Sequence, residues 1–346
     1  VNTFSVVFKK KLFDERKYSR IIANKFQTNH HEIELASQDI LHQIEEPFKY
    51  MENPSVDGIN TFFISKSVHK KGFKMAISGV GSDELFSGYP VFKNAYELNN
   101  KKWLFSFPPQ IRKLAGYFLT KYQTSEKLKK INEILNLKLL ELTYFYPVFR
   151  KIFNEVEIKN LLKEPNNFQS SYPFQWGVNE LSYKKRGAKL SFLNKVSVLE
   201  LETYLQNVLL RDADQMGMGN SLEIRVPFLD HRLVEYVLSL SDQYKYPNYP
   251  KQLLIDSTKG WIPDEIIHRK KMGFVLPWEL WIKNELREFC GAAIFSLEET
   301  ALFNMKNVIS LWKSYLKGDP SIHWLQIWNL VVFSKWCSIN IKTASK

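Results

Sequence analysis

Hydrophobic and polar residues follow two different periods along the first hundred residues of the chain. Short runs rich in β-branched and aromatic residues predict β-strands at 3–8, 30–35 and 73–78. Apolar residues at helical spacing predict helices between them, at 14–26, 37–48 and 56–72. Because strands that alternate with helices are typical of βαβ units, we expect a parallel sheet that binds its ligand beyond the carboxyl ends of the strands.

The strand pattern fades after about residue 100. Helical patterns replace it at 108–122, 155–164, 197–216 and 307–318, and in the Trp-rich stretch near the end of the chain. We therefore predict the α/β class and a single domain over 1–346. Its α/β part would lie at 1–100, followed by a mainly helical part at 101–346.

The sequence SGVGSDELFSGYP follows the third predicted strand, where a parallel sheet binds ligands. Ser78 and Gly79 end the strand, Gly81 leaves room for a close backbone approach, and Ser82 is a natural N-cap of a following helix. Amide groups at such a turn can bind an anion, and Asp83 can hold Mg²⁺. A plain strand-to-helix turn, with acidic residues that stabilise the helix dipole, explains the same residues equally well.

A second stretch, at 209–240, places many charged residues among apolar ones. It contains more charge than a core helix needs, including Arg211, Asp212 and Asp214. We favour a buried structural ion network over catalysis for Glu223, Arg225 and Asp230.

A third stretch, at 249–281, begins a helix with a lysine. Lys251 opposes the dipole of that helix, and a nearby anionic partner would account for its position. A solvated surface lysine is the default alternative. Lys271 lies in the basic loop HRKKMGFVLP that follows.

Together, the three stretches resemble one family, the synthetase domain of glutamine-dependent asparagine synthetases. The segments that carry the resemblance are SGVGSDELFSGYP, SLEIRVPFLDHR and KQLL with the loop HRKKMGFVLP. It covers nearly the whole chain and is weakest at 100–190. It implies an adenine-nucleotide layer of the PP-loop ATP pyrophosphatase type, truncated at its first strand, that continues into a large helical region.

The resemblance also implies a reaction. Members of the family adenylate a substrate carboxylate with Mg·ATP and release pyrophosphate, and ammonia then displaces AMP to give an amide. ATP and Mg²⁺ would be the cofactors, aspartate the default substrate, and asparagine or a related amide the product. The ammonia would come from glutamine.

By the same resemblance, Val6 would line the adenine pocket, and Ser78, Gly79 and Gly81 would lie against the nucleotide. Asp83 would hold Mg²⁺ against pyrophosphate, and Lys251 would neutralise charge around the α-phosphate in both half-reactions. The substrate-side candidates are Arg211, Asp212, Asp214 and Lys271.

The sequence departs from the family pattern in three places. The family's ATP loop, Ser-Gly-Gly-x-Asp-Ser, does not occur in these residues, and we expect it upstream of Val1. The glutaminase domain with its N-terminal cysteine is absent too, so this chain alone is expected to be inactive. Val80 stands where the family carries an acid proposed as a general base, and a valine cannot accept a proton.

Val80 leaves other readings open. One alternative is a divergent ligase or amidotransferase that acts on a glycan or peptide carboxylate. Another is a non-catalytic scaffold that retains the fold.

Charge, hydrophobicity and cysteine content limit the classes of partner that we expect. The net charge is +12, but the basic clusters are short and scattered, so we expect no nucleic-acid partner. No apolar run reaches the roughly 18 to 20 residues that span a bilayer, and the start is unlike a signal peptide, so we expect no membrane partner. Two cysteines, Cys290 and Cys337, cannot form a disulfide framework, which favours the cytoplasm. A homodimer is compatible with the sequence.

Overall fold

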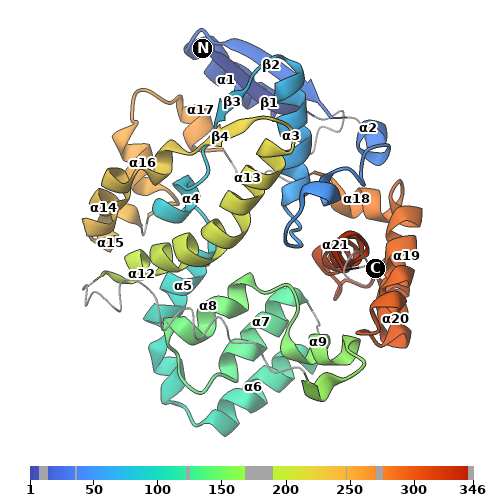
Figure 1. Ribbon diagram of the computed structural model, residues 1–346. Helices are drawn as coiled ribbons and strands as arrows, with labels where there is room; N and C mark the ends of the chain where they lie inside the picture. Colours follow the sequence, from blue (N-terminus) through green and yellow to red (C-terminus); the bar gives the residue numbers. More distant parts are fainter. Residues whose placement is uncertain are drawn as a thin grey trace.

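The computed structural model describes residues 1–7, 15–35, 37–121, 125–167, 190–246, 248–269 and 276–341. Figure 1 shows the short strands and α3 at one end of the molecule and α6 to α9 at the other end. Helices α18 to α21 line one side, and α14 to α17 line the opposite side. Within the described residues, no helix combines the length and the apolar character needed to cross a bilayer.

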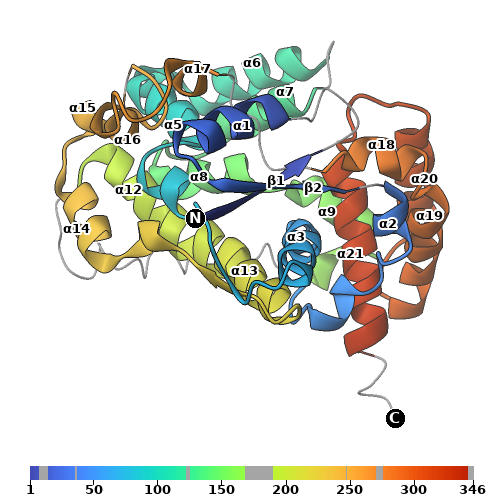
Figure 2. The ribbon, with the colours of Figure 1, turned by 90° about the horizontal axis from the view of Figure 1, so that it is seen from above.

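The first sheet is a parallel pair with helices on both faces. β1 (Asn2–Val7) and β2 (Asn29–Glu34) pair in parallel, with Val6 opposite Ile33. In Figure 2, α1 (Arg16–Lys25) and α3 (Gly58–Lys70) lie on opposite sides of this pair. The predicted strands and helices of this part are confirmed, although α2 (Ser37–Leu41) is short and is followed by the 3₁₀-helix η2 (Pro47–Tyr50).

A second parallel pair joins the strand before the glycine-rich loop to a strand far along the chain. β3 (Met75–Ile77) pairs with β4 (Glu223–Arg225), and the Ser78 N–H extends the ladder by donating to the Arg225 carbonyl at 2.8 Å. β3 is confirmed, whereas β4 is not among the predicted strands. In the described part of the chain, the predicted parallel layer consists of two separate short sheets.

The charged residues around β4 do not form the predicted buried ion network. Glu223 and Arg225 are exposed and form an ion pair, with Nε 2.9 Å from Oε1, because residues two apart on a strand point to the same face. Asp230 pairs with Arg232 and accepts its backbone N–H at the start of α14 (His231–Ser239). That prediction is wrong: these charges remain at the surface, where water solvates them.

One long helical run lies behind the glycine-rich loop. It consists of α12 (Phe192–Leu199), the π-helix η5 (Glu200–Leu209) and α13 (Leu210–Met218). The helix predicted at 197–216 is therefore confirmed, but its middle is π-helical, a rare geometry that is frequent at functional sites. α13 packs against α3, while α4 (Ser82–Leu85) packs against η5 and α12, and α5 (Pro90–Asn100) against α12.

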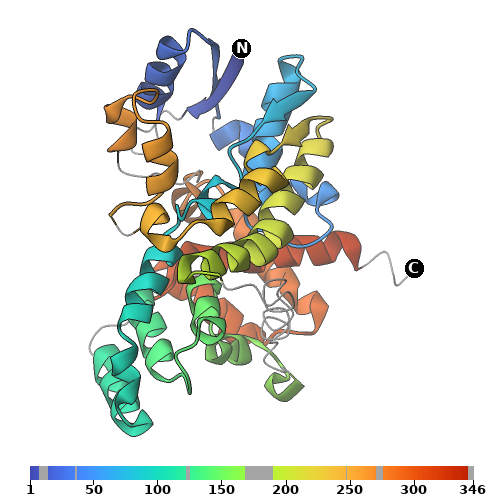
Figure 3. The ribbon, with the colours of Figure 1, turned by 90° about the vertical axis from the view of Figure 1, so that its left-hand side faces the viewer.

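The remaining elements are helical. They are η3 (Lys102–Ser106), α6 (Pro109–Lys121), α7 (Glu126–Leu135), α8 (Leu142–Arg150), α9 (Glu155–Leu161), η4 (Pro165–Asn167), η6 (Pro227–Leu229), α15 (Asp242–Lys245), α16 (Gln252–Ser257), α17 (Asp264–Ile267), α18 (Trp278–Lys283), α19 (Arg287–Ser296), η7 (Leu297–Thr300), α20 (Met305–Leu316) and α21 (Trp324–Asn340). In the view of Figure 3, the teal helices that include α6 project away from the rest of the molecule.

The largest core cluster ties the α/β part to the C-terminal helices. Trp278 of α18 stacks on Trp328 of α21, with ring centroids 4.3 Å apart. Ile59 and Phe62 of α3 belong to the same buried cluster. Since α3 also covers the first sheet, this core fixes the α/β part relative to α18–α21.

Candidate active site

The glycine-rich loop turns sharply at Gly81. Gly81 has φ +94°, in the left-handed region that favours glycine, and it N-caps α4. Ser82 is therefore the first helical residue and not the N-cap that the sequence predicted. A Cβ at Gly81 would lie 2.6 Å from Cδ2 of Leu229, which follows β4. The close approach predicted at Gly81 is thus made by a protein side chain.

Lys251 and Asp83 come together although 168 positions separate them in the sequence. The Lys251 Nζ lies 3.2 Å from Asp83 Oδ1 and donates to Ser82 Oγ at 3.1 Å. A helix begins at this lysine, as predicted: Lys251 is the N-cap of α16, with φ +58°. A lysine in the left-handed region is strained, and such strain is frequent at functional sites. Of the two alternatives that the sequence left open for Lys251, the structure shows the anionic neighbour.

Gly88 keeps this cluster in place. A Cβ at Gly88 would lie 1.9 Å from Asp83 Oδ1 and 2.5 Å from Lys251 Cε. Its N–H also donates to the Asp83 carbonyl at 2.8 Å. Sequence reasoning did not select Gly88, although its place in the same glycine-rich segment was an available signal. A residue with a side chain would push the carboxylate and the ammonium apart.

The start of the loop borders open space. The Val80 N–H donates to Ser78 Oγ at 3.3 Å, and the Gly79 carbonyl accepts from the Ser82 N–H at 3.2 Å. A Cβ added at Gly79 would meet no heavy atom within 4 Å. A ligand could therefore approach the backbone at Gly79 closely.

Asp212 is buried on α13, facing the start of α3. It accepts a hydrogen bond from Ser55 Oγ at 2.5 Å, and Gly58 leaves room for its carboxyl group, since a Cβ there would lie 2.9 Å from Oδ1. Burial raises the pKa of Asp212 to about 7. Arg211 is half-buried, whereas Asp214 is exposed. Residues two apart on a helix point in different directions, so Asp212 and Asp214 do not converge on one ligand.

An ion pair with a fully buried carboxylate lies behind the loop, where the sequence had suggested no site. Arg150 Nε donates to Glu200 Oε1 at 2.9 Å, Nη2 bonds Oε2, and the Tyr146 hydroxyl donates to Oε1 at 2.5 Å. The guanidinium carbon lies 4.0 Å from the ring centroid of Tyr204 and 4.9 Å from that of Tyr89. Burial alone would lower the pKa of Arg150, but the hydrogen bonds and charge of Glu200 raise it, so the guanidinium stays charged.

The same two tyrosines connect this pair to more carboxyl groups. The Tyr204 hydroxyl donates to Asp57 Oδ2 and the Tyr89 hydroxyl to Glu84 Oε1, each at 3.0 Å. Burial raises the pKa of both carboxyl groups. Asp57, Arg150 and Tyr204 also line a cavity of about 280 Å³. The network therefore reaches from α4 of the glycine-rich loop to a cavity on its far side.

Comparison with known proteins decides which family carries this arrangement. The sequence matches the family model described as Asparagine synthase over residues 1–338. The chain belongs to the asparagine synthase family. The resemblance carried by the three sequence motifs is confirmed.

Three curated relatives illustrate the similarity. The glutamine-hydrolyzing asparagine synthetase 1 of Bacillus subtilis (strain 168) is 28% identical over 345 residues, 99% of this chain and 52% of that protein. A putative glutamine-hydrolyzing asparagine synthetase of Mycobacterium tuberculosis (strain H37Rv) is 23% identical, over 98% of this chain and 51% of that protein. Amidase chyE of Penicillium rubens is 23% identical, over 78% of this chain and 42% of that protein. The chain spans about half the length of the synthetases it matches.

Two of the predicted site residues, Val6 and Lys271, are not among the described members of the cluster formed by Lys251, Ser82 and Asp83. Val6 lies in β1, half-buried, and packs against the largest core cluster. Lys271 lies outside the described residues. The roles predicted for both stay predictions.

The donor set at the loop suits Mg²⁺ held jointly with phosphate. The described residues contain no group of three or more acidic, His or Cys side chains that could enclose a metal. Mg²⁺ is commonly bound through one or two carboxylates together with substrate phosphates. Asp83, with 22% of its side chain exposed, beside the open space at Gly79, fits that mode.

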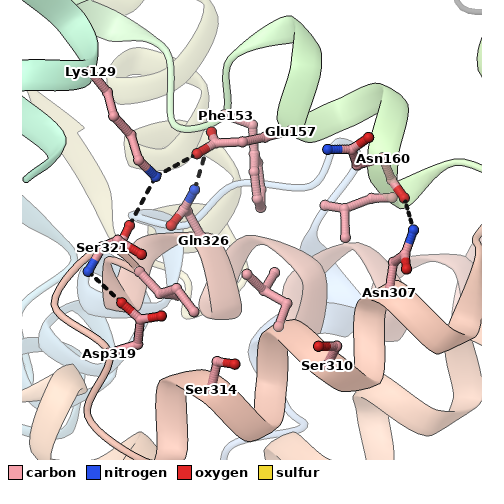
Figure 4. Close-up of a pocket in the computed structure, with 13 residues that line it drawn as sticks. Lys129, Phe153, Glu157, Asn160, Asn307, Ser310, Ser314, Asp319, Ser321 and Gln326 are labelled. Atoms are coloured by element: carbon pink, nitrogen blue, oxygen red, sulfur yellow. Dashed lines mark hydrogen bonds and ion pairs between the residues drawn. The ribbon is translucent and has the colours of Figure 1, made fainter. Parts of the chain in front are cut away.

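A larger cavity, of about 550 Å³, is lined by other residues. Figure 4 shows Lys129, Glu157 and Gln326 on one side of it and Ser310 and Ser314 of α20 on the other. Lys129 Nζ bonds Glu157 Oε1 at 2.8 Å and the Ser321 carbonyl at 3.1 Å, so its charge is compensated. None of the candidate active-site residues lines this cavity.

Proposed function

We propose that this chain is the ATP-dependent synthetase part of an amide-forming enzyme. It would adenylate a substrate carboxylate, release pyrophosphate and pass the acyl group to ammonia or an amine. The observation that carries the proposal is the contact of Lys251 with Ser82 and Asp83 at the end of a parallel strand, beside open space at Gly79. Membership of the asparagine synthase family supports it.

Lys251 would act in both half-reactions. In the first, a carboxylate oxygen attacks the α-phosphorus of ATP, and the bond to pyrophosphate breaks as negative charge grows on the phosphate oxygens. A fixed ammonium near those oxygens stabilises that charge. In the second, the amine nitrogen attacks the acyl carbon, AMP leaves with the bonding electrons, and the amine loses a proton. Lys251 would then stabilise the departing phosphate of AMP.

Asp83 would hold Mg²⁺ against the pyrophosphate. The ion would supply further neutralisation of phosphate charge when bound. Ser78, Gly79 and Gly81 would form the backbone surface on which the nucleotide lies. Gly88 would keep the Asp83 carboxylate and the Lys251 ammonium at their present separation.

The default acceptor would be aspartate, and the product would be asparagine. The reaction would take place in the cytoplasm. Ammonia would come from glutamine through a glutaminase domain, as the names of the synthetase relatives suggest for those proteins. Val80 favours a second candidate, a ligase that acts on a glycan or peptide carboxylate, because a valine offers no base for the attacking amine. Arg211, Asp212 and Asp214 would contribute to selecting between the two.

Pyrophosphate release by the full-length protein that contains this chain tests the proposal. With Mg·ATP and a panel of carboxylic acids, we expect Lys251→Met to lower turnover at least about a hundredfold, since it removes a charge that acts on the transition state. Lys306→Ala, at an exposed lysine in the first turn of α20, is the matched control and should leave turnover unchanged. Unchanged turnover in Lys251→Met would overturn the role of this lysine.

The choice of acceptor and a scaffold role are tested in the same preparation. Aspartate turnover far above that of uronic acids and peptide carboxylates would dismiss the second candidate. If the protein were a scaffold without nucleotide chemistry, it would release no pyrophosphate with any acid. Binding of Mg·ATP that Asp83→Ala abolishes would count against that scaffold.

A further inference from the structure

Helix α6 exposes an apolar face where an ordinary amphipathic helix would bury it. Ile111, Leu114 and Phe118 are spaced three and four residues apart and therefore share one face. Their exposed fractions are 54%, 56% and 52%. Just before the helix, Trp103 and Phe107 are 60% and 46% exposed, with ring centroids 6.1 Å apart. We call these five residues the α6 apolar face.

The opposite side of α6 is anchored firmly. Arg112 is buried, and its guanidinium donates to the carbonyls of Leu135 and Leu137, both at 3.0 Å. Gly116 packs against α7 so closely that a Cβ would lie 2.1 Å from Asn132 Oδ1. The α6 apolar face is thus held outward by the contacts on the other side of the helix.

The charged residues in the segment that carries this face have a single sign. No Asp or Glu occurs between Glu97 and Glu126. Four exposed lysines lie in that interval: Lys101, Lys102, Lys113 and Lys121. Exposed apolar and aromatic side chains flanked by lysines are typical of helices that lie in the interface of a membrane.

We propose that the α6 apolar face docks the protein on an anionic lipid surface. Protein–protein interfaces are depleted of lysine, whereas each lysine close to an anionic bilayer strengthens binding. Aromatic side chains would enter the headgroup region, and the lysines would lie against the lipid phosphates. The sequence-based expectation of no membrane partner rested on the lack of a membrane-spanning segment and of a signal peptide. Neither feature bears on docking at the membrane surface.

Co-sedimentation of the full-length protein with vesicles tests this proposal. We expect binding to vesicles of phosphatidylcholine and phosphatidylserine, little binding to phosphatidylcholine alone, and release by high salt. Trp103→Ala combined with Phe118→Ala should weaken partitioning about tenfold or more, because both rings lose their burial in lipid. Trp261→Ala is the matched control, since Trp261 is 72% exposed at the turn before α17 and should not affect binding.

Other outcomes overturn the proposal. Absence of binding to anionic vesicles would do so, and so would equal loss of binding in Trp261→Ala. A wild-type dimer that the Trp103→Ala and Phe118→Ala variant converts to a monomer, with unchanged vesicle binding, would assign this face to a second copy of the chain. Because the replaced side chains are exposed, the variant should keep the wild-type thermal unfolding midpoint, which confirms that it folds.

Discussion

Two ion pairs near the glycine-rich loop differ in the burial of their carboxylates. Glu200 is fully buried, accepts from Arg150 and Tyr146, and its arginine lies between the rings of Tyr89 and Tyr204. The Lys251–Asp83 pair keeps 26% and 22% of its side chains exposed, beside open space. The two cations are about equally exposed, 25% for Arg150 and 26% for Lys251, but only the lysine pair also exposes its carboxylate. The lysine pair therefore keeps both of its charges available to a ligand.

The largest expected effect on stability comes from the arginine pair. Arg150→Met should lower the free energy of unfolding by about 3–5 kcal/mol, because it leaves the Glu200 carboxylate buried without a counter-charge. Urea denaturation followed by circular dichroism measures the change. Arg225→Met, in the exposed pair with Glu223, is the control and should change the midpoint little. A wild-type midpoint for Arg150→Met would show that the two pairs do not differ as we describe.

The buried carboxyl group of Asp212 should make stability depend on pH. Its pKa is raised from 3.8 to about 7, so the folded state holds this proton more tightly than the unfolded state. The free energy of unfolding should therefore fall as pH rises from about 4 to about 7, on the order of a few kcal/mol for this group, and the contribution is constant above that range. Asp212→Asn, compared with wild type across this range, should remove that part of the decline. Parallel curves for the two proteins would contradict the assignment.

A smaller loss of stability is expected from a substitution at Gly88, which lies against the Lys251–Asp83 pair. Gly88→Ala should cost about 1–3 kcal/mol, because the new methyl group must displace the Asp83 carboxylate. Mg·ATP binding should weaken as well, since the carboxylate leaves its position. Gly79→Ala has open space around its Cβ and serves as the folding control. Equal Mg·ATP affinity in Gly88→Ala and wild type would argue against the placement of the metal on Asp83.

The smallest effect on stability should come from Lys251 itself. Lys251→Met should change the free energy of unfolding by about 1 kcal/mol or less, because a partly exposed ion pair contributes little. The same variant is expected to lose turnover, so stability and activity separate at this residue. A loss of stability as large as that of Arg150→Met would show that Lys251 serves mainly to hold the fold.

The sequence predicts the elements that have their own periodic pattern. β1, β2, β3 and the helices between them follow from apolar spacing alone. β4 has only three residues, and its strand geometry depends on pairing with β3, so no local pattern marks it. Gly81 was selected as a close approach, but the neighbour is Leu229, which only the β3–β4 pairing brings near.

The site was predictable to the extent that its residues lie in continuous motifs. Lys251 and Asp83 were selected because each lies in a dense motif, and the structure brings them into contact. Asp57, Arg150 and Glu200 are scattered over the chain, and each alone resembles an ordinary surface charge. The α6 apolar face has a clear helical period, but period alone does not say whether a face is covered.

The π-helix η5 determines how α13 is rotated about the helix axis relative to α12. Leu193, Val196 and Leu199 before it point into the core around α5 and α8, while Asp212 after it points to Ser55 beside α3. Hydrogen bonds in a π-helix span one residue more than in an α-helix. The π-helix therefore takes up extra sequence and changes which residues of α13 face α3. If all of 200–209 wound as an ordinary α-helix, the run would gain the rotation of one α-helical residue and turn α13 by roughly 100°. Asp212 would then point away from Ser55 although no side chain of the site had been replaced.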